Sequence, residues 1–394
     1  MAETVPASAG NQTAAIGAGL VLSVGAAWLG AGQGWRQGAL WLVGAGLGVA
    51  LYHATFGFTA AYRHLLADRR TAGLRAQMLM LGVAVLLFHP VLAGGELLGQ
   101  PVRGFVFPVG VALLIGAFLF GVGMQLGGGC GSGTLYAAGG ASGRSLLTLL
   151  FFVVGATLAA WDAARWQGLP ALPPVSLPAS LGTWPAIALA LVVFVLIWRA
   201  AAALERQRHG AVAPIFGAGA GWRQLPSGPW PLAWGALALA LLNFATLALA
   251  GRPWAITAAF PLWGSMAVDW LGWDDPVFWP YWEDPTRAEA LLRPLAADRI
   301  TIMDLGLMAG AMLAAGLAGR FALHWRLPWG AAAASVVGGL LLGYGAVLAF
   351  GCNISAFFSG IASGSLHGWV WIGPALLGNW VGLRLRPAFG LGRG

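Results

Sequence analysis

The stretch GVGMQLGGGCGSGTLYAAGGAS, from Gly121 to Ser142, occurs a second time in this sequence in altered form. The second copy is GYGAVLAFGCNISAFFSGIAS, residues 343–363. Identical residues fall at one constant offset: Gly121, Gly123, Leu126, Gly129 and Cys130 align with Gly343, Gly345, Leu348, Gly351 and Cys352. A shorter match lies upstream of each copy, FTAAY at residues 58–62 and ITAAF at residues 256–260. Because both matches keep their order, the sequence predicts two related halves.

The composition predicts an all-α polytopic membrane protein. Of 394 residues, 59% are hydrophobic and 9% are charged, compared with about 25% charged in an average soluble domain. Helical apolar runs of about 20 residues span a bilayer, and we expect nine or ten of them, near 14–32, 37–54, 74–94, 105–126, 144–164, 183–203, 230–250, 302–322, 329–350 and 367–386. Four shorter pieces, near 55–66, 131–141, 254–270 and 353–363, are predicted as re-entrant half-helices, which need protein or water around their backbone.

The crossing count predicts how the two halves are oriented. We count five crossings per half, and an odd number places the second half upside down, as an inverted pseudo-two-fold repeat. All 21 basic residues are Arg, and placing both termini on one side assigns 14 of them to that face. By the positive-inside rule this face is cytoplasmic, in a bacterial inner membrane. The chain then divides into an N-terminal half (1–204), a cytoplasmic linker (205–229) and a C-terminal half (230–394), with the acidic, aromatic segment 270–299 as a periplasmic cap.

The two glycine-rich breaks are predicted to carry the chemistry. Each aims one cysteine, Cys130 or Cys352, at the middle of the bilayer, where discontinuous helices form the sites of many transporters. Short helices are expected to begin at Ser132 and Asn353, and helix N-termini present unpaired N–H groups that favour an anion. Neighbouring glycines let a solute approach the peptide groups closely; these are Gly129, Gly131 and Gly351.

Three further polar residues complete the candidate site. His53 lies deep in the second predicted crossing, where an ionisable residue is expensive and therefore a functional candidate. Thr59 and Thr257 are the paired hydroxyls of the shorter repeat. No cofactor or metal is expected, because the two cysteines form no CxxC pair. The net charge of +8 is spread over short loops, so we do not expect nucleic-acid binding.

The sequence resembles the YeeE/YedE transporters in its paired GC-containing loops and in FTAAYR, residues 58–63. The resemblance covers roughly residues 37–390 and implies an hourglass-shaped bundle with short helices meeting at its waist. It also implies thiosulfate uptake, with cysteines passing the ion along by weak thiol hydrogen bonds. Cys130 and Cys352 match two family cysteines. A third, expected just before FTAAYR, is replaced by Gly57, and His53 and Thr55 are the nearest polar groups.

We therefore expect a permease, not an enzyme, that imports a small sulfur-containing anion across the lipid bilayer, with thiosulfate as the first candidate. A cytoplasmic sulfur-carrier protein could pull the ion through. One alternative is a membrane thiol oxidoreductase or sulfur-transfer protein that cycles Cys130 and Cys352, although no Lys, Arg or His stands nearby to activate a thiol. Another is a channel for a neutral or cationic solute, which would need acidic or carbonyl rings.

Overall fold

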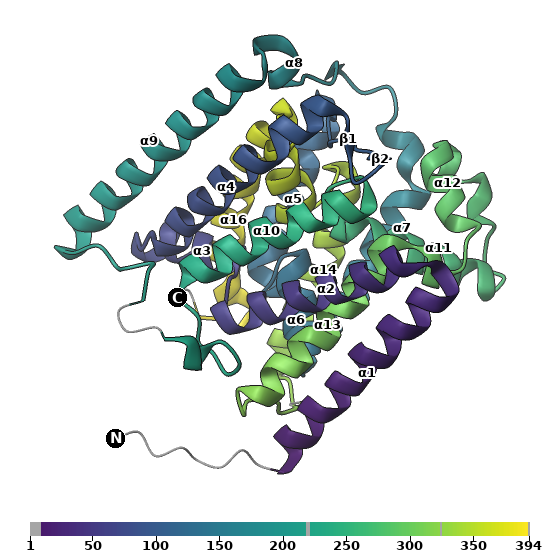
Figure 1. The fold of residues 1–394 in the computed structure, drawn as a ribbon, viewed down its shortest axis with the longest axis horizontal. Helices are drawn as coiled ribbons and strands as arrows, with labels where there is room; N and C mark the ends of the chain where they lie inside the picture. Colours follow the sequence, from purple (N-terminus) through teal and green to yellow (C-terminus); the bar gives the residue numbers. More distant parts are fainter. Residues whose placement is uncertain (1–8, 218–220, 324, 393–394) are drawn as a thin grey trace.

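The computed structural model describes residues 9–217, 221–323 and 325–392, and within them the chain is an all-α polytopic bundle (Figure 1). The ten long helices are α1 (Ala9–Gln33), α2 (Trp35–Ala54), α4 (Ala72–Gly94), α5 (Val111–Gly127), α7 (Gly143–Trp161), α9 (Thr183–His209), α10 (Leu232–Ala250), α13 (Arg299–Leu317), α14 (Trp329–Leu348) and α16 (Leu366–Leu385). Nine segments in these described ranges are long and apolar enough to cross a membrane. The remaining predicted crossing, near 367–386, is α16, which packs against α5. The chain is a multi-pass membrane protein.

The four short pieces predicted from the sequence are also helical. They are α3 (Phe58–Asp68), α6 (Gly131–Gly139), η3 with α11 (Ile256–Ala258 and Ala259–Trp270), and η7 with α15 (Asn353–Phe358 and Ser359–Ala362). Residues 353–358 form a π-helix, a wider turn that is found mostly at functional sites. Three of these pieces, α6, η3 and η7, contact one another although they are far apart in the sequence.

The remaining elements lie between the long helices. Two small antiparallel ladders join β1 (Glu96–Leu97) to β2 (Gln100–Pro101) and β3 (Val109–Gly110) to β4 (Ala171–Leu172). The short helices are η1 (Ala163–Trp166), α8 (Leu177–Leu181), η2 (Trp222–Gln224), η4 (Pro276–Phe278), η5 (Pro280–Glu283), α12 (Pro285–Leu291), η6 (Leu295–Ala297) and η8 (Arg386–Phe389). The segment predicted as a cap, 270–299, packs through Trp279 and Trp282 on Leu262 of α11 and Ala160 of α7.

Helices α5 and α14 cross through glycines that correspond in the two repeat copies. A Cβ added at Gly116 of α5 would lie 2.8 Å from the Gly345 carbonyl oxygen of α14, and one added at Gly123 would lie 2.8 Å from the Gly338 carbonyl oxygen. Gly116 and Gly338 are related by the same offset as Cys130 and Cys352, and so are Gly123 and Gly345. Each contact is therefore the copy of the other, which is the pattern of a self-complementary two-fold crossing.

The helices outside this central crossing repeat the same exchange. A Cβ at Gly121 of α5 would lie 2.1 Å from the Ala375 carbonyl oxygen of α16, and one at Gly343 of α14 would lie 2.1 Å from the Phe152 carbonyl oxygen of α7. Small residues let membrane helices approach backbone to backbone, because dispersion contacts drive their association in lipid. The repeated GxG pattern of the sequence thus sets the packing of both pairs.

The repeat unit is smaller than the sequence suggested. Helices α2, α4, α5 and α7 correspond in order to α10, α13, α14 and α16, so each unit holds four long helices and not five. Helices α1 and α9 have no counterpart and lie at opposite outer edges of the bundle (Figure 1). In each, only 22% of the apolar stretch is buried, as expected for lipid-facing helices. Five long helices still lie between the start of the first unit and the start of the second, because α9 follows the four helices of the first unit. The number is still odd, as an inverted repeat requires.

The linker predicted at 205–229 begins inside α9, which continues to His209, and residues 218–220 lie outside the described ranges. Glu205 is fully buried and accepts hydrogen bonds from Thr71 Oγ1 at 2.7 Å and from Arg75 Nη2 at 3.0 Å. Arg75 is 4% exposed and also donates to the Ala213 carbonyl oxygen at 2.6 Å. This ion pair fastens the end of α9 and the segment after it to the start of α4.

Replacing Glu205 by Gln should lower the thermal stability of the purified protein, because it leaves the Arg75 charge buried without a partner. Breaking a buried pair in this way costs about 3–5 kcal/mol. Glu289→Gln is the matched control, since its pair with Arg293 is more than half exposed and surface pairs contribute about 0–1 kcal/mol. Equal unfolding midpoints for the two variants would contradict this role for Glu205.

Candidate substrate site at the two cysteine loops

Both cysteine loops leave their long helix through left-handed backbone and reach the cysteine in the extended region. Helix α5 ends at Gly127, Gly128 turns with φ +85°, and Cys130 follows with φ −93° and ψ −166°. In the second copy Phe350 and Gly351 turn with φ +58° and +133°, and Cys352 follows with φ −102° and ψ −167°. The two cysteines therefore hold equivalent positions in structure as well as in sequence.

Each cysteine is itself the N-cap of the short helix that follows. Helix α6 begins at Gly131 with Cys130 as its cap, so the predicted start at Ser132 is wrong by one residue; the predicted start at Asn353 is observed. The predicted position failed because Ser is a common N-cap residue and Cys is not. With the cysteine at the cap, its sulfur stands beside the first-turn N–H groups.

The sulfur atoms interact weakly with their own helices. Cys352 Sγ accepts a hydrogen bond from the Ile354 N–H at 3.4 Å and lies 3.8 Å from Ser355 Oγ. Cys130 Sγ lies 3.5 Å from Ser132 Oγ, and Cys130 makes no side-chain cap bond. Both cysteines are free and at most 1% exposed. The first-turn N–H groups of α6 thus face a sulfur and not the oxygen acceptor of a usual N-cap.

The second cysteine lies against the loop of the first. A Cβ built at Gly131 would be 3.0 Å from Cys352 Sγ and 3.1 Å from Thr257 Cγ2. Thr257 Oγ1 lies 3.5 Å from Ser355 Oγ. Since Gly131 follows Cys130 directly, the thiol of the second half touches the first half one residue from the other cysteine.

The neighbouring glycines are required by close approach. A Cβ at Gly129 would lie 2.9 Å from the Thr134 amide nitrogen, and one at Gly351 would lie 2.3 Å from Ser355 Cβ. In both copies the residue before the cysteine faces the turn that follows it. Side chains at either position would push the new helix away from the break.

Buried polar atoms without a protein partner gather on the same elements. Thr59 Oγ1 of α3, Thr134 Oγ1 of α6 and Asn353 Oδ1 of η7 each have no hydrogen-bond partner. The Asn353 amide donates to Tyr62 OH at 3.2 Å, which joins η7 to α3. Such atoms are rare in native interiors and indicate a bound ligand or water.

Gln125 is a site residue that the sequence reading missed. It is fully buried in α5, and its amide donates to the Thr59 carbonyl oxygen at 3.2 Å and to Asn379 Oδ1 at 2.8 Å. Its Oε1 atom has no protein partner. A lone amide side chain inside an otherwise apolar crossing was the available signal. Tyr62, the last residue of the shorter repeat, is a second residue of this region that was not predicted as part of the site.

His53 lies apart from the cysteine loops in the contacts described. Its ring packs on Trp230 with centroids 5.5 Å apart, and its carbonyl oxygen accepts from the Trp230 N–H at 2.8 Å. A Cβ at Gly228 would lie 2.7 Å from His53 Nδ1. The structure thus places His53 against the segment before α10. Thr55, the other polar group near Gly57, is exposed and ends α2 with φ +45°.

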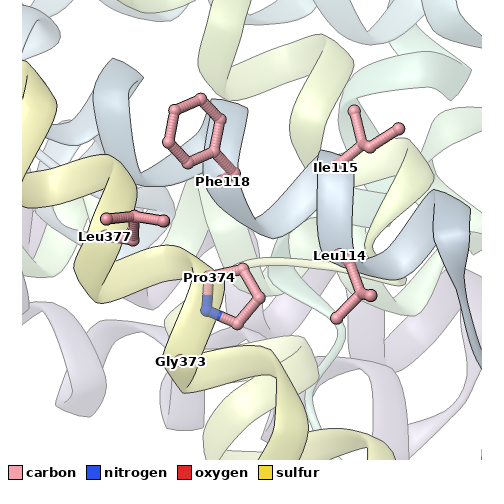
Figure 2. Close-up of a pocket in the computed structure, with 6 residues that line it drawn as sticks. All are labelled: Leu114, Ile115, Phe118, Gly373, Pro374 and Leu377. Atoms are coloured by element: carbon pink, nitrogen blue, oxygen red, sulfur yellow. The ribbon is translucent and has the colours of Figure 1, made fainter.

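The apolar grooves of the molecule lie elsewhere. Figure 2 shows one between α5 and α16, lined by Leu114, Ile115 and Phe118 from α5 and by Gly373, Pro374 and Leu377 from α16. A second lies between α4 and α9. Leu377 is 55% exposed, so the first groove opens on the outer surface. Such grooves suit acyl chains, whereas an anion would find no donor there.

Comparison with known proteins agrees with the resemblance noted above. The sulphur transport family matches residues 53–381 of the chain. The thiosulfate transporter TsuA of Spirochaeta thermophila is 28% identical over 365 residues, which is 86% of this chain and 96% of TsuA. The probable transporter YedE of Salmonella typhimurium is 31% identical over 166 residues, and the match spans 41% of this chain and 39% of YedE.

These relatives are transporters and not enzymes, as the sequence reading expected for this chain. The family match begins at His53 and ends beyond Asn379, so it contains both cysteine loops and all four short helical pieces. Helix α1 lies before the match. The chain belongs to the sulphur transport family.

Proposed function

We propose that the chain is a permease that imports a small sulfur-containing anion, with thiosulfate as the first candidate, past Cys130 and Cys352. The observation that carries this proposal is the packing of Cys352 Sγ against Gly131, next to Cys130. It brings the two sulfurs to one buried region of the bundle. The name of the TsuA relative supports thiosulfate, and the family supports a sulfur compound.

The substrate set follows from the predicted residues. Cys130 and Cys352 present the thiols, Ser132, Thr59 and Thr257 present hydroxyls, and Asn353 presents an amide. Gly129, Gly131 and Gly351 keep the two breaks narrow enough to meet. His53, which packs on Trp230, would act at the edge of this group of residues and not in its centre.

Weak contacts suit passage of a divalent anion. Moving an ion of this kind into the protein interior costs several kcal/mol per charge, roughly, even after relaxation. Hydrogen bonds to a charged group contribute about 1.5–3 kcal/mol each, so a few backbone and hydroxyl donors offset the cost without trapping the ion. A fixed opposite charge between the two thiols would hold it longer, and the GGGCGSG and FGCNIS loops contain no Lys or Arg.

The orientation belongs to the same proposal. The arginine-rich face, which contains the α3–α4 turn and the end of α16, is the cytoplasmic one in a bacterial inner membrane, with both termini on that side. The two repeat units, α2 to α7 and α10 to α16, then approach the midplane from opposite sides as an inverted repeat. A cytoplasmic sulfur carrier would bind at this face and draw the ion inward.

The nearness of the two sulfurs also favours a second candidate, a thiol oxidoreductase. In that case the two thiols would form a disulfide and release two protons and two electrons to an acceptor. Among the contacts described, the sulfurs meet hydroxyls and N–H groups, and no cationic side chain is among them. Transport and redox cycling give different results in the following test.

Uptake of labelled thiosulfate into proteoliposomes should fall at least tenfold for Cys130→Ala and for Cys352→Ala tested separately, because each removes one of two successive contacts; a tenfold loss corresponds to about 1.4 kcal/mol. Thr246→Ala is the matched control, since this buried hydroxyl bonds only within its own helix α10. Full uptake by the Cys130→Ser, Cys352→Ser double variant would remove the thiol role. A redox-dependent disulfide without net uptake would favour the oxidoreductase.

Replacing Gly57 by Cys should be tolerated and should raise thiosulfate uptake at low concentration. A Cβ at Gly57 has ordinary contacts, 3.7 Å to Ala60 Cβ and 3.8 Å to Tyr136 OH, and the backbone is extended there. The added thiol restores the missing third family cysteine beside the Cys130 loop. Gly57→Ala supplies the volume without the thiol, and equal uptake by the two variants would show that a third thiol is not limiting.

A further inference from the structure

Three arginines converge beside the Cys130 break, on the side of the arginine-rich face. Arg63 lies in α3, Arg144 in the first turn of α7 and Arg386 at the end of α16. Helix α3 is joined to the last turns of α5 four residues before Arg63, where the Gln125 amide donates to the Thr59 carbonyl oxygen at 3.2 Å. The charge of Arg63 acts on both Arg144 and Arg386 from there. We call these three residues the arginine cluster.

Two of the three arginines have a structural task. Arg386 Nη1 donates to the Gln125 carbonyl oxygen at 2.9 Å, and Arg144 Nη2 donates to the Leu126 carbonyl oxygen at 2.6 Å. These carbonyls belong to the last turn of α5, which has no further helical partners. The Arg144 guanidinium also lies on the break, since a Cβ at Gly128 would be 3.5 Å from its Cζ. The cluster is thus two residues from Cys130.

The third arginine is not needed for this task. Arg63 is half-buried, and its Nε has no hydrogen-bond partner. Asp68 acts on Arg63 electrostatically, but its carboxylate pairs with His64 at 3.4 Å. In the described part of the chain, no carboxylate lies within ion-pair distance of any cluster residue.

The cluster holds more positive charge than the helices can balance. Each helix C-terminus carries about −0.5 elementary charge, so the ends of α5 and α16 together offset about one of three guanidinium charges. Burial, together with repulsion from Arg63 and Arg144, lowers the pKa of Arg386 to about 10, which leaves it protonated at neutral pH. A divalent anion would balance the remainder.

The other end of the molecule has no such cluster, although the fold repeats there. The position of Arg63 is taken by Pro261 in the repeat. Arg144 lies two residues after Ser142, the N-cap of α7. The residue in the same place after Ser365, the N-cap of α16, is His367, whose ring contacts that of Phe107.

At the position of Arg386 the two halves carry side chains of opposite charge. The residue after α16 is Arg386, whereas the residue after α7 is Asp162, which accepts from Tyr344 OH and pairs with Arg165. The cations are therefore a difference between the halves, and the shared fold is built at the other end without three arginines at these positions.

We propose that Arg63, Arg144 and Arg386 form a binding site for a small divalent oxyanion between Cys130 and the arginine-rich face. This inference rests on the proposed function, in which the site receives the transported ion after the thiols. Its position makes the two ends of the symmetric fold unlike, because these three guanidinium groups have no counterpart at the matching positions of the other half. The guanidinium group suits oxyanions through paired N–H donors.

The test measures binding of sulfate and of thiosulfate to the purified full chain in detergent, at constant ionic strength set with sodium chloride. Arg63→Gln should raise the Kd for both anions about tenfold or more, the loss expected for one charge-assisted hydrogen bond. Arg63→Lys should recover part of the binding. Arg69→Gln, which changes an exposed arginine at the C-terminal end of the same helix α3, should bind as the original chain does. Equal losses in Arg63→Gln and Arg69→Gln would overturn the site, since they would indicate general surface charge.

The cysteine double variant separates this inference from the proposed function. Sulfate binding should persist when Cys130 and Cys352 are both Ser, even if uptake stops, and loss of sulfate binding there would place the anion at the thiols and overturn the proposal. If the serine variant still transports and Arg63→Gln still loses binding, the arginine site stands and the thiol pathway fails. A phospholipid phosphate is the competing source of the same chemistry. Loss of sulfate binding in phosphatidylglycerol nanodiscs, with binding retained in phosphatidylcholine nanodiscs, would assign the cluster to a headgroup.

Discussion

A helix that stops inside a bilayer must have its exposed backbone groups satisfied by protein, and this constraint shapes the centre of the molecule. At the break after α5, the last carbonyls are met by side chains from two other helices, Arg144 and Arg386, and Thr148 Oγ1 meets the Gly127 carbonyl oxygen at 3.1 Å. On the far side of the break, the N–H groups of α6 face a cysteine instead of the usual cap oxygen. The backbone groups of the break are therefore met by strong donors at one end and by a weakly accepting sulfur at the other, which is where the proposed function places the anion.

Two-fold repetition of the fold accounts for the second break, and the two breaks differ in the side chains that surround them. The α5–α14 crossing is reciprocal down to individual glycines, and both cysteines share one backbone conformation. Around this shared frame the two ends differ: the Arg144 guanidinium lies at Gly128, whereas Phe350, at the matching position, stacks on Phe107 with centroids 4.8 Å apart. The two breaks of the shared frame therefore have unlike surroundings, with fixed positive charge at one and stacked aromatic rings at the other.

The sequence predicted the crossings and the four short pieces because long apolar runs and internal repeats are strong signals. It misplaced the start of α6, since cap preference names Ser132 and tertiary packing puts Cys130 there. It also put five crossings in each half, because hydropathy cannot tell that α1 and α9 lack counterparts. Gln125 was visible in the sequence as a lone amide inside an apolar crossing, but the arginine cluster was not, because it depends on which helices lie beside α5 and only packing decides that.

The central claim is that one anion can touch the thiols of both halves. Sulfur anomalous scattering from crystals grown with thiosulfate would measure this directly, since both cysteine sulfurs and both thiosulfate sulfurs give signals. The account predicts thiosulfate peaks within contact distance of Cys130 Sγ and Cys352 Sγ. Peaks beside one cysteine only, with the other sealed in apolar packing, would contradict it.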